Sequence, residues 1–231
     1  MKYFFWIIFL VPMIVVSQAE LDKASALFAK GKLDDSQKIF ESYLKQDANN
    51  LRALEGLGDI YGSQKQWEKA LPYYEKIRDI KPKEANYHYK YGGVVGMIAK
   101  ESNKFKALGL IGEIKRSFEK AIELDPKHID ARWALLELYI QLPGIVGGSE
   151  KKANRYASEL LKLSPVDGYL SKARIEEHFD RYKEAEIQYK KAIEVSGSKI
   201  AYQKLADLYK NKMNQPEKAK QILGQYNEKN K

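Results

Sequence analysis

The sequence predicts an all-α fold, a solenoid of about six helical hairpins. A trio made of a mostly small residue, an aromatic or apolar residue and a second small or apolar residue recurs six times. The steps between trios are 34, 44, 39, 32 and 34 residues. Pro82, Pro126 and Pro165 stand at one offset after three of the trios, where a proline ends a helix. A single hairpin cannot bury its own apolar face, so stacked hairpins are expected to form the core.

Each trio marks the second helix of a hairpin. The trios are Ser36, Phe40, Tyr43; Ala70, Tyr74, Ile77; Ile114, Phe118, Ala121; Ala153, Ala157, Leu160; Ala185, Tyr189, Ala192; and Ala219, Leu223, Tyr226. The expected helix pairs are 20–30 with 33–45, 50–63 with 67–80, 85–101 with 107–124, 128–141 with 149–163, 168–178 with 182–195, and 199–212 with 216–229. These pairs divide a repeat domain over 20–231 into units of about 17–50, 51–84, 85–128, 129–165, 166–198 and 199–231.

The third hairpin carries about ten extra residues, which we expect to lengthen both of its helices. Its first helix contains Gly92, Gly93 and Gly96, and each glycine inside a helix costs about 1 kcal/mol relative to alanine. Close helix packing or a ligand near the backbone would compensate. Packing is the simpler interpretation.

The fourth hairpin has an insertion, Leu142 to Ser149, between its helices. Backbone amides at two glycines, a helix N-terminus and two lysines together would suit an anion. This candidate anion-binding loop consists of Gly147, Gly148, Ser149, Lys151 and Lys152. The alternative is that the glycines only shape the turn. The loop lacks the Lys-Ser/Thr ending of a nucleotide-binding P-loop.

The N-terminus has the organisation of a secretory signal peptide. Lys2 precedes an apolar run from Tyr3 to Val16, and Ser17-Gln18-Ala19 follows. The run is short for a membrane span of about 20 residues. We therefore expect a signal peptide over 1–19, cleavage after Ala19, and a periplasmic or secreted protein. A retained anchor is the alternative.

The composition excludes several kinds of catalytic and metal-binding site. The chain has no cysteine, which excludes disulfides, thiolate metal sites and cysteine nucleophiles. His88, His128 and His178 do not have metal-ligand spacing, and no catalytic motif is present. We expect no enzyme, no cofactor and no metal. The formal net charge of +9 suits acidic proteins, lipid head groups or envelope polymers, and nucleic acid is not an expected partner of an exported protein.

One unit, Leu51 to Glu84, carries a specific pattern. It reads Leu54-x2-Leu57-Gly58-x2-Tyr61, then Ala70-x3-Tyr74, then Pro82, and so resembles a tetratricopeptide repeat. The stretch from Gly112 to Pro126 and the Pro143–Gly148 loop also resemble bacterial exported tetratricopeptide proteins with a PGIVGG-type loop. The resemblance implies a right-handed superhelix whose first helices line a concave groove. It implies no catalytic residue.

Carried over to this chain, the resemblance predicts which residues face the groove. They are Arg52, Glu55, Asp59, Asn86, Tyr89, Gly93, Met97, Trp133, Glu137 and Ile140, continued by Leu170, Arg174 and Glu177. Tyr89 and Trp133 occupy equivalent places in adjacent repeats and are candidate binding hot spots, although Trp133 packing into the next hairpin is the alternative. Glu55 and Asp59 disfavour a ligand that ends in a carboxylate.

The predicted function is a scaffold or adaptor that binds a peptide or partner protein in the groove. The alternative is binding of an anionic envelope polymer or lipid through basic outer faces. The last apolar face, formed by Ile222, Leu223 and Tyr226, is expected to be covered by a partner or a second chain.

Overall fold

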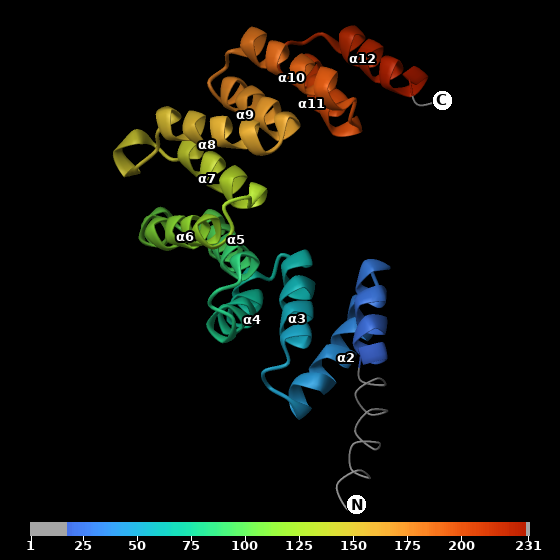
Figure 1. The fold of residues 1–231 in the computed structure, drawn as a ribbon, viewed down its shortest axis with the longest axis vertical. Helices are drawn as coiled ribbons and strands as arrows, with labels where there is room; N and C mark the ends of the chain where they lie inside the picture. The colour runs from blue at the N-terminus through green and yellow to red at the C-terminus, as the bar shows by residue number, and fades with distance from the viewer. Residues whose placement is uncertain (1–17, 230–231) are drawn as a thin grey trace, which may run out of the picture. The chain divides into compact units, whose positions relative to one another are not determined.

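Helices and turns make up residues 18–229, the part of the chain that the computed structural model describes, and this part contains no strand (Figure 1). A first helix covers 18–29. It is followed by α2 (Leu33–Gln46), α3 (Leu51–Ser63), α4 (Trp67–Ile80), α5 (Ala85–Glu101), α6 (Lys104–Leu124), α7 (Ile129–Gln141), the 3-10 turn η1 (Gly144–Val146), α8 (Glu150–Leu163), α9 (Pro165–His178), α10 (Tyr182–Ser196), α11 (Lys199–Asn211) and α12 (Pro216–Lys229). The predicted all-α hairpin fold is confirmed.

Residues 1–17, most of the expected signal peptide, lie outside the described residues. Between residues 18 and 229, no helix is both long enough and apolar enough to cross a membrane.

The chain divides into two compact units, one ending at Ser117 and the other starting at Phe118, within α6. In each unit the helices that follow one another in sequence pack together. The first unit pairs α2 with α3, α3 with α4 and α4 with α5, and the second pairs each helix from α7 to α12 with the next (Figure 1). This is the arrangement of stacked hairpins.

The trios form the core, as their spacing predicted. Their first members are all buried: Ser36, Ala70, Ile114, Ala153, Ala185 and Ala219. The sixth trio differs, because Leu223 is 38% exposed. The Leu223 side chain is therefore only partly covered by its neighbours.

Three hairpin turns share one backbone conformation. Gly31, Lys65 and Asp180 have φ of 74°, 58° and 59°, which is the left-handed region. The next residue in each turn donates its amide hydrogen to the carbonyl five residues back, with N···O distances of 2.8 to 2.9 Å. This is the Schellman motif, which satisfies carbonyls at a helix end and starts the reversal into the next helix.

Two helices start three residues earlier than predicted. Asn103 caps α6 by accepting from the amide of Lys106 at 3.0 Å, so α6 begins at Lys104. Ser164 caps α9, and Pro165 takes the first helical position, where a missing N–H is harmless. The proline after α8 therefore also begins the next helix. The third hairpin is lengthened as predicted, since α5 has 17 residues and α6 has 21.

The packing explanation for the α5 glycines is wrong at two positions. A Cβ built at Gly93 meets nothing within 4 Å, and one at Gly96 comes no closer than 3.9 Å to Ile114. Gly56 in α3 behaves in the opposite way, because a Cβ there would lie 2.3 Å from the Phe40 ring. Close approach therefore explains Gly56, while Gly93 leaves a space open.

Candidate functional site

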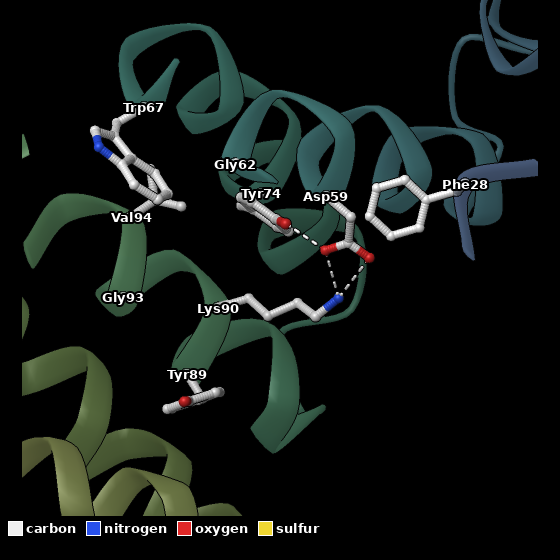
Figure 2. Close-up of a pocket in the computed structure, with 9 residues that line it drawn as sticks. All are labelled: Phe28, Asp59, Gly62, Trp67, Tyr74, Tyr89, Lys90, Gly93 and Val94. Atoms are coloured by element: carbon white, nitrogen blue, oxygen red, sulfur yellow. Dashed lines mark hydrogen bonds and ion pairs between the residues drawn. The ribbon is translucent and has the colours of Figure 1, made fainter. Parts of the chain in front are cut away.

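The first unit contains a pocket of about 480 Å³ next to Gly93 (Figure 2). The residues around it come from the helix over 18–29, from α3, from α4 and from α5. They are Phe28, Asp59, Gly62, Trp67, Tyr74, Tyr89, Lys90, Gly93 and Val94. Four of the nine are aromatic, so most of the wall is apolar.

One end of the pocket is polar. The ammonium of Lys90 donates to Glu55 Oε1 at 2.7 Å and to Asp59 Oδ1 at 2.9 Å. The Tyr74 hydroxyl donates to the same Asp59 carboxylate (Figure 2). These contacts connect α3, α4 and α5 at one point.

The charges at this end are fixed by their neighbours. Burial alone would lower the pKa of Lys90, but its hydrogen bonds to Glu55 and Asp59 outweigh burial and raise that pKa. Burial, together with the Asp59 charge, also raises the pKa of Tyr74, so its hydroxyl remains a donor. One ammonium therefore faces two carboxylates at neutral pH. This end of the pocket keeps one negative charge.

The aromatic walls are held in place. The Trp67 indole N–H donates to Glu101 Oε1 at 2.8 Å, which ties the start of α4 to the end of α5. The Tyr74 ring is 5% exposed, and the Lys90 ammonium lies 5.6 Å from its centroid. Val94, which is 6% exposed, closes the wall beside Gly93. A ligand would therefore meet a largely preformed surface.

The structure brings together four of the predicted groove residues of the first unit. Tyr89 and Gly93 line the pocket, Asp59 lies at its polar end, and Glu55 shares Lys90 with Asp59. The remaining three lie elsewhere: Arg52 pairs with Asp22 at 2.6 Å, Asn86 is exposed and Met97 is half-buried.

Sequence reasoning missed Phe28, Trp67 and Lys90. The repeat spacing contained a signal for two of them. Lys90 lies 31 and 35 residues from its acidic partners, and Trp67 lies 34 residues from Glu101. Contacts between equivalent positions of successive hairpins have about this separation.

The predicted groove residues of the second unit are engaged in contacts within that unit. The Trp133 indole N–H donates to Asp167 at 2.9 Å, and Glu137 pairs with Arg174 at 2.8 Å. The Trp133 side chain is half-buried. Ile140 was expected to face the groove, and this is wrong, because it is 4% exposed and packs in the core.

Three further predicted residues belong to the same unit. Leu170 is half-buried and packs against the core, and Arg174 is the partner of Glu137. Glu177 accepts a hydrogen bond from the Tyr189 hydroxyl at 2.7 Å. Tyr89 and Trp133 lie in different units, so their pairing in one groove stays a prediction.

In the glycine-rich loop, the backbone donors are already used. The amides of Gly147, Gly148 and Ser149 donate to the carbonyls of Gly144, Pro143 and Tyr139 at 2.9 to 3.1 Å. Gly147 has φ of 101°, and a Cβ at Gly148 would lie 1.8 Å from the Leu142 carbonyl oxygen. These contacts favour the structural role of the glycines.

The polar side chains of the loop are engaged in part. The Ser149 hydroxyl accepts from the amide of Lys152 at 3.2 Å and caps α8. The Lys152 ammonium lies 5.1 Å from the Tyr139 ring centroid, and Lys151 is exposed. Anion binding would have to rely on the lysines and on the remaining amides in the first turn of α8.

Most of the apolar face of α12 is covered within the chain. Ile222 packs against the core of the second unit, and the Tyr226 ring lies 5.3 Å from the Tyr202 ring. Leu223 is the most exposed of the three predicted side chains. Self-association through this face would therefore rest on a small apolar area.

Residues 18–229 contain no group of three or more histidine, cysteine, aspartate or glutamate side chains that could hold a metal ion. The buried or half-buried polar side chains described above bind one another. The pocket in the first unit, with its aromatic walls and its polar end, suits recognition of a side chain of a ligand.

Comparison with known proteins gives the family. Family models described as tetratricopeptide repeat match residues 21–85, 166–199 and 200–230. The chain is 27% identical over 153 residues to the protein O-mannosyl-transferase TMTC1 of Mus musculus. That match covers 64% of this chain but 15% of the transferase, so the chain spans about a seventh of the length of this relative.

Solved structures show the same fold. The protein TTC0263 of Thermus thermophilus, a thermophilic tetratricopeptide-repeat protein, superposes with a TM-score of 0.67 at 18% identity, covering 83% of this chain and 98% of that one. YrrB, described as having an unusual peptide-binding site, superposes with a TM-score of 0.54 at 16% identity, covering 79% and 87%. The repeat spacing, the stacked hairpins and the matched segments agree, and the chain belongs to the tetratricopeptide-repeat family.

Proposed function

We propose that this protein is an interaction scaffold that captures an extended segment of a partner protein, with one apolar side chain of that segment seated in the pocket beside Gly93. The observation that carries the proposal is the aromatic wall of Phe28, Trp67, Tyr74 and Tyr89 around an open space. Aromatic side chains present a large contact area and lose little conformational entropy on binding.

The polar end sets a preference for the residues next to the anchor. Lys90 is held by Glu55 and Asp59, and these three groups together keep one negative charge. A ligand carboxylate would be repelled here, as the sequence predicted. A basic residue next to the apolar anchor would instead be attracted to Glu55, whose side chain is 30% exposed.

The expected affinity from this pocket alone is modest. Burying one large apolar side chain contributes about 1.5–3 kcal/mol, which is about tenfold to a hundredfold in the dissociation constant. Tight binding therefore needs further contacts outside the pocket. Tyr89, in the pocket wall, and Trp133, in the second unit, each stay a proposed hot spot. The peptide-binding site named for YrrB supports this use of the fold.

We also propose that the chain is not itself an enzyme and that it acts after export. The mannosyl-transferase resemblance covers 15% of that enzyme, and the polar groups around the pocket form ion pairs with one another. Export rests on the Lys2 and Tyr3–Val16 segment. Cell fractionation of the full chain, with and without residues 1–19, tests it: retention of both forms in the cytoplasm would refute export.

Gly93→Leu is the sharpest test of the pocket. A Cβ built there meets no neighbouring atom within 4 Å, and Gly93 lines the pocket, so a leucine side chain should fill the pocket without disturbing α5. The matched control is Gly109→Leu in α6, where a Cβ also meets nothing within 4 Å. Helical content by circular dichroism should be the same for both variants and the wild type.

The probe is a phage library of random peptides, followed by titration of enriched peptides against the intrinsic tryptophan fluorescence, to which Trp67 contributes. The wild type and Gly109→Leu should both enrich sequences with a large apolar residue near a basic one. Gly93→Leu should weaken the enriched peptides by about tenfold or more, the loss of one buried apolar side chain. Equal binding by Gly93→Leu, or an enrichment of acidic C-terminal peptides, would show that the pocket is not the site.

A further inference from the structure

The first unit carries a second feature that the pocket does not use, at the place where α5 ends and α6 begins. Phe105 is 89% exposed and Leu108 is 46% exposed, one helical turn apart on α6. We call this region the α5–α6 tip. It comprises Phe105 and Leu108 together with Lys65, Lys69, Lys100, Lys104 and Lys106.

The local sequence at the tip is poor for folding stability. The first turn of α6 holds Lys104 and Lys106 and no acidic residue, although the helix dipole favours negative charge at that end. Phe105 in the same turn gains almost nothing from folding, since its side chain stays in solvent. Residues that break local rules in this way often serve recognition.

Three of these lysines line a hollow. A pocket of about 490 Å³ lies beside the tip, and Lys65, Lys69 and Lys106 line it together with Glu68 and Glu101. Glu101 accepts from the Trp67 indole, and Glu68 pairs with Lys106 at 2.8 Å with both side chains more than half exposed. An exposed pair of this kind is weak and can exchange partners.

The tip is therefore apolar at its end and basic around it. The five lysines of the tip and the two glutamates of the hollow together carry a net charge of +3 near Phe105 and Leu108. Pairing of this surface with a second copy would bring the lysines of both chains together. An acidic protein would match the charge, but the protruding Phe105 ring would then need a pocket on that protein, and the charge match does not supply one.

We propose that the α5–α6 tip seats on an anionic lipid bilayer. Phe105 and Leu108 enter the boundary between head groups and acyl chains, and the surrounding lysines contact lipid phosphates. Long lysine side chains keep their ammonium groups in the polar layer while their stems lie along apolar surface. Trp67 lines both the hollow and the peptide pocket, but Phe105 and Leu108 lie outside that pocket, and the proposal does not depend on peptide binding.

Each lysine near an anionic membrane contributes about 1 kcal/mol, or about fivefold in affinity. Lys100→Gln with Lys104→Gln should therefore weaken binding by about 25-fold. Phe105→Ser should weaken binding by about tenfold or more, because it removes the inserted ring. Phe105 is exposed, so this substitution should leave the fold intact.

The first experiment sediments the full chain with vesicles of phosphatidylcholine mixed with phosphatidylglycerol, and with vesicles of phosphatidylcholine alone. Residues 1–17 are common to every variant, so differences between variants report on the tip. Ile200→Ser, at a side chain 60% exposed, is the matched control for Phe105→Ser. Lys199→Gln with Lys204→Gln is the control for the lysine pair. Weaker binding of the tip variants alone, stronger on anionic vesicles and reduced by salt, supports the proposal.

A second readout uses the absence of cysteine from the chain. Leu108→Cys, labelled with a polarity-sensitive dye, should show a blue shift with anionic vesicles, while labelled Ile200→Cys should not. An unchanged signal at 108, or equal binding of Phe105→Ser and Ile200→Ser, would overturn the proposal. A shift that rises with protein concentration in the absence of vesicles would identify a second copy as the partner, and a shift with polyglutamate would identify an acidic protein.

Discussion

Gly93→Ala and Gly56→Ala should change the free energy of unfolding in opposite directions. Both glycines lie inside helices of the first unit, so alanine should gain about 1 kcal/mol of helix propensity at each position. The space around the two positions decides the outcome. A Cβ at Gly93 meets nothing within 4 Å, and one at Gly56 would lie 2.3, 2.5 and 2.6 Å from three atoms of the Phe40 ring.

Phe40 has little room to move, because it is 3% exposed and packs among Leu21, Ala24 and Ala53. Overpacking of a core costs about 1–3 kcal/mol, and contacts this short belong at the upper end. We therefore expect Gly93→Ala to raise the free energy of unfolding by about 1 kcal/mol. Gly56→Ala should lower it by about 2 kcal/mol after the helix gain is included.

Urea unfolding followed by circular dichroism measures both changes, and the slope with urea should be the same for each variant. Gly109→Ala serves as the control, since it occupies open space on α6 and should gain as much as Gly93→Ala. Destabilisation by Gly93→Ala would show that the space beside α5 is filled in solution, and the pocket argument would then be wrong.

Three further predictions use the same measurement. Lys90→Met should lower the free energy of unfolding by about 2 kcal/mol at neutral pH, because Glu55 and Asp59 lose the ammonium that they share. Since the fold raises the pKa of Lys90, this difference should persist up to its ordinary pKa of 10.5 and disappear as the pH rises through the higher folded value. Glu186→Gln should cost about 1 kcal/mol at neutral pH. Burial opposes the charge of Glu186, but hydrogen bonds from Lys190 and Tyr209 outweigh burial and lower its pKa, so the cost should vanish as the pH falls below 4.5 and through the folded value. Lys65→Gly should gain about 1 kcal/mol, because it relieves a positive φ.

Each of these predictions has a contrary result. If Lys90→Met still lowered the free energy of unfolding above the raised pKa, the loss would come from packing and not from charge. The same conclusion would follow if Glu186→Gln lowered the free energy of unfolding in acid. Asp180→Gly, in an equivalent turn, should gain less than Lys65→Gly, since aspartate tolerates the left-handed region better. An equal gain would contradict the conformational explanation.

The repeat pattern was sufficient to predict the helices. Trios such as Ala70, Tyr74 and Ile77 recur because each hairpin meets its neighbour in the same way, and their burial follows from that spacing. Helix starts were less predictable, since a cap at Asn103 or Ser164 competes with neighbouring polar residues that look equally suitable.

The candidate site was predictable only in part. Glu55, Asp59 and Tyr89 were predicted from the resemblance to tetratricopeptide repeats, in which the first helix of each hairpin lines a groove. Lys90 was missed, since only the structure shows that its long side chain reaches back to the preceding hairpin. The open space beside Gly93 is formed by residues from other helices, so it could not be predicted from the sequence around Gly93.

The pairing of helices with their sequence neighbours also bears on how the chain folds. In each unit nearly all packing joins consecutive helices, and the pair of α7 with α9 is a small exception. Such short sequence separations require little chain entropy to be lost before a contact forms, and they favour rapid folding. A newly synthesised hairpin can pack as soon as the preceding hairpin has formed. The protein should therefore assemble stepwise from either end of a unit, and an extra hairpin should lengthen the chain with little effect on how fast the existing hairpins form.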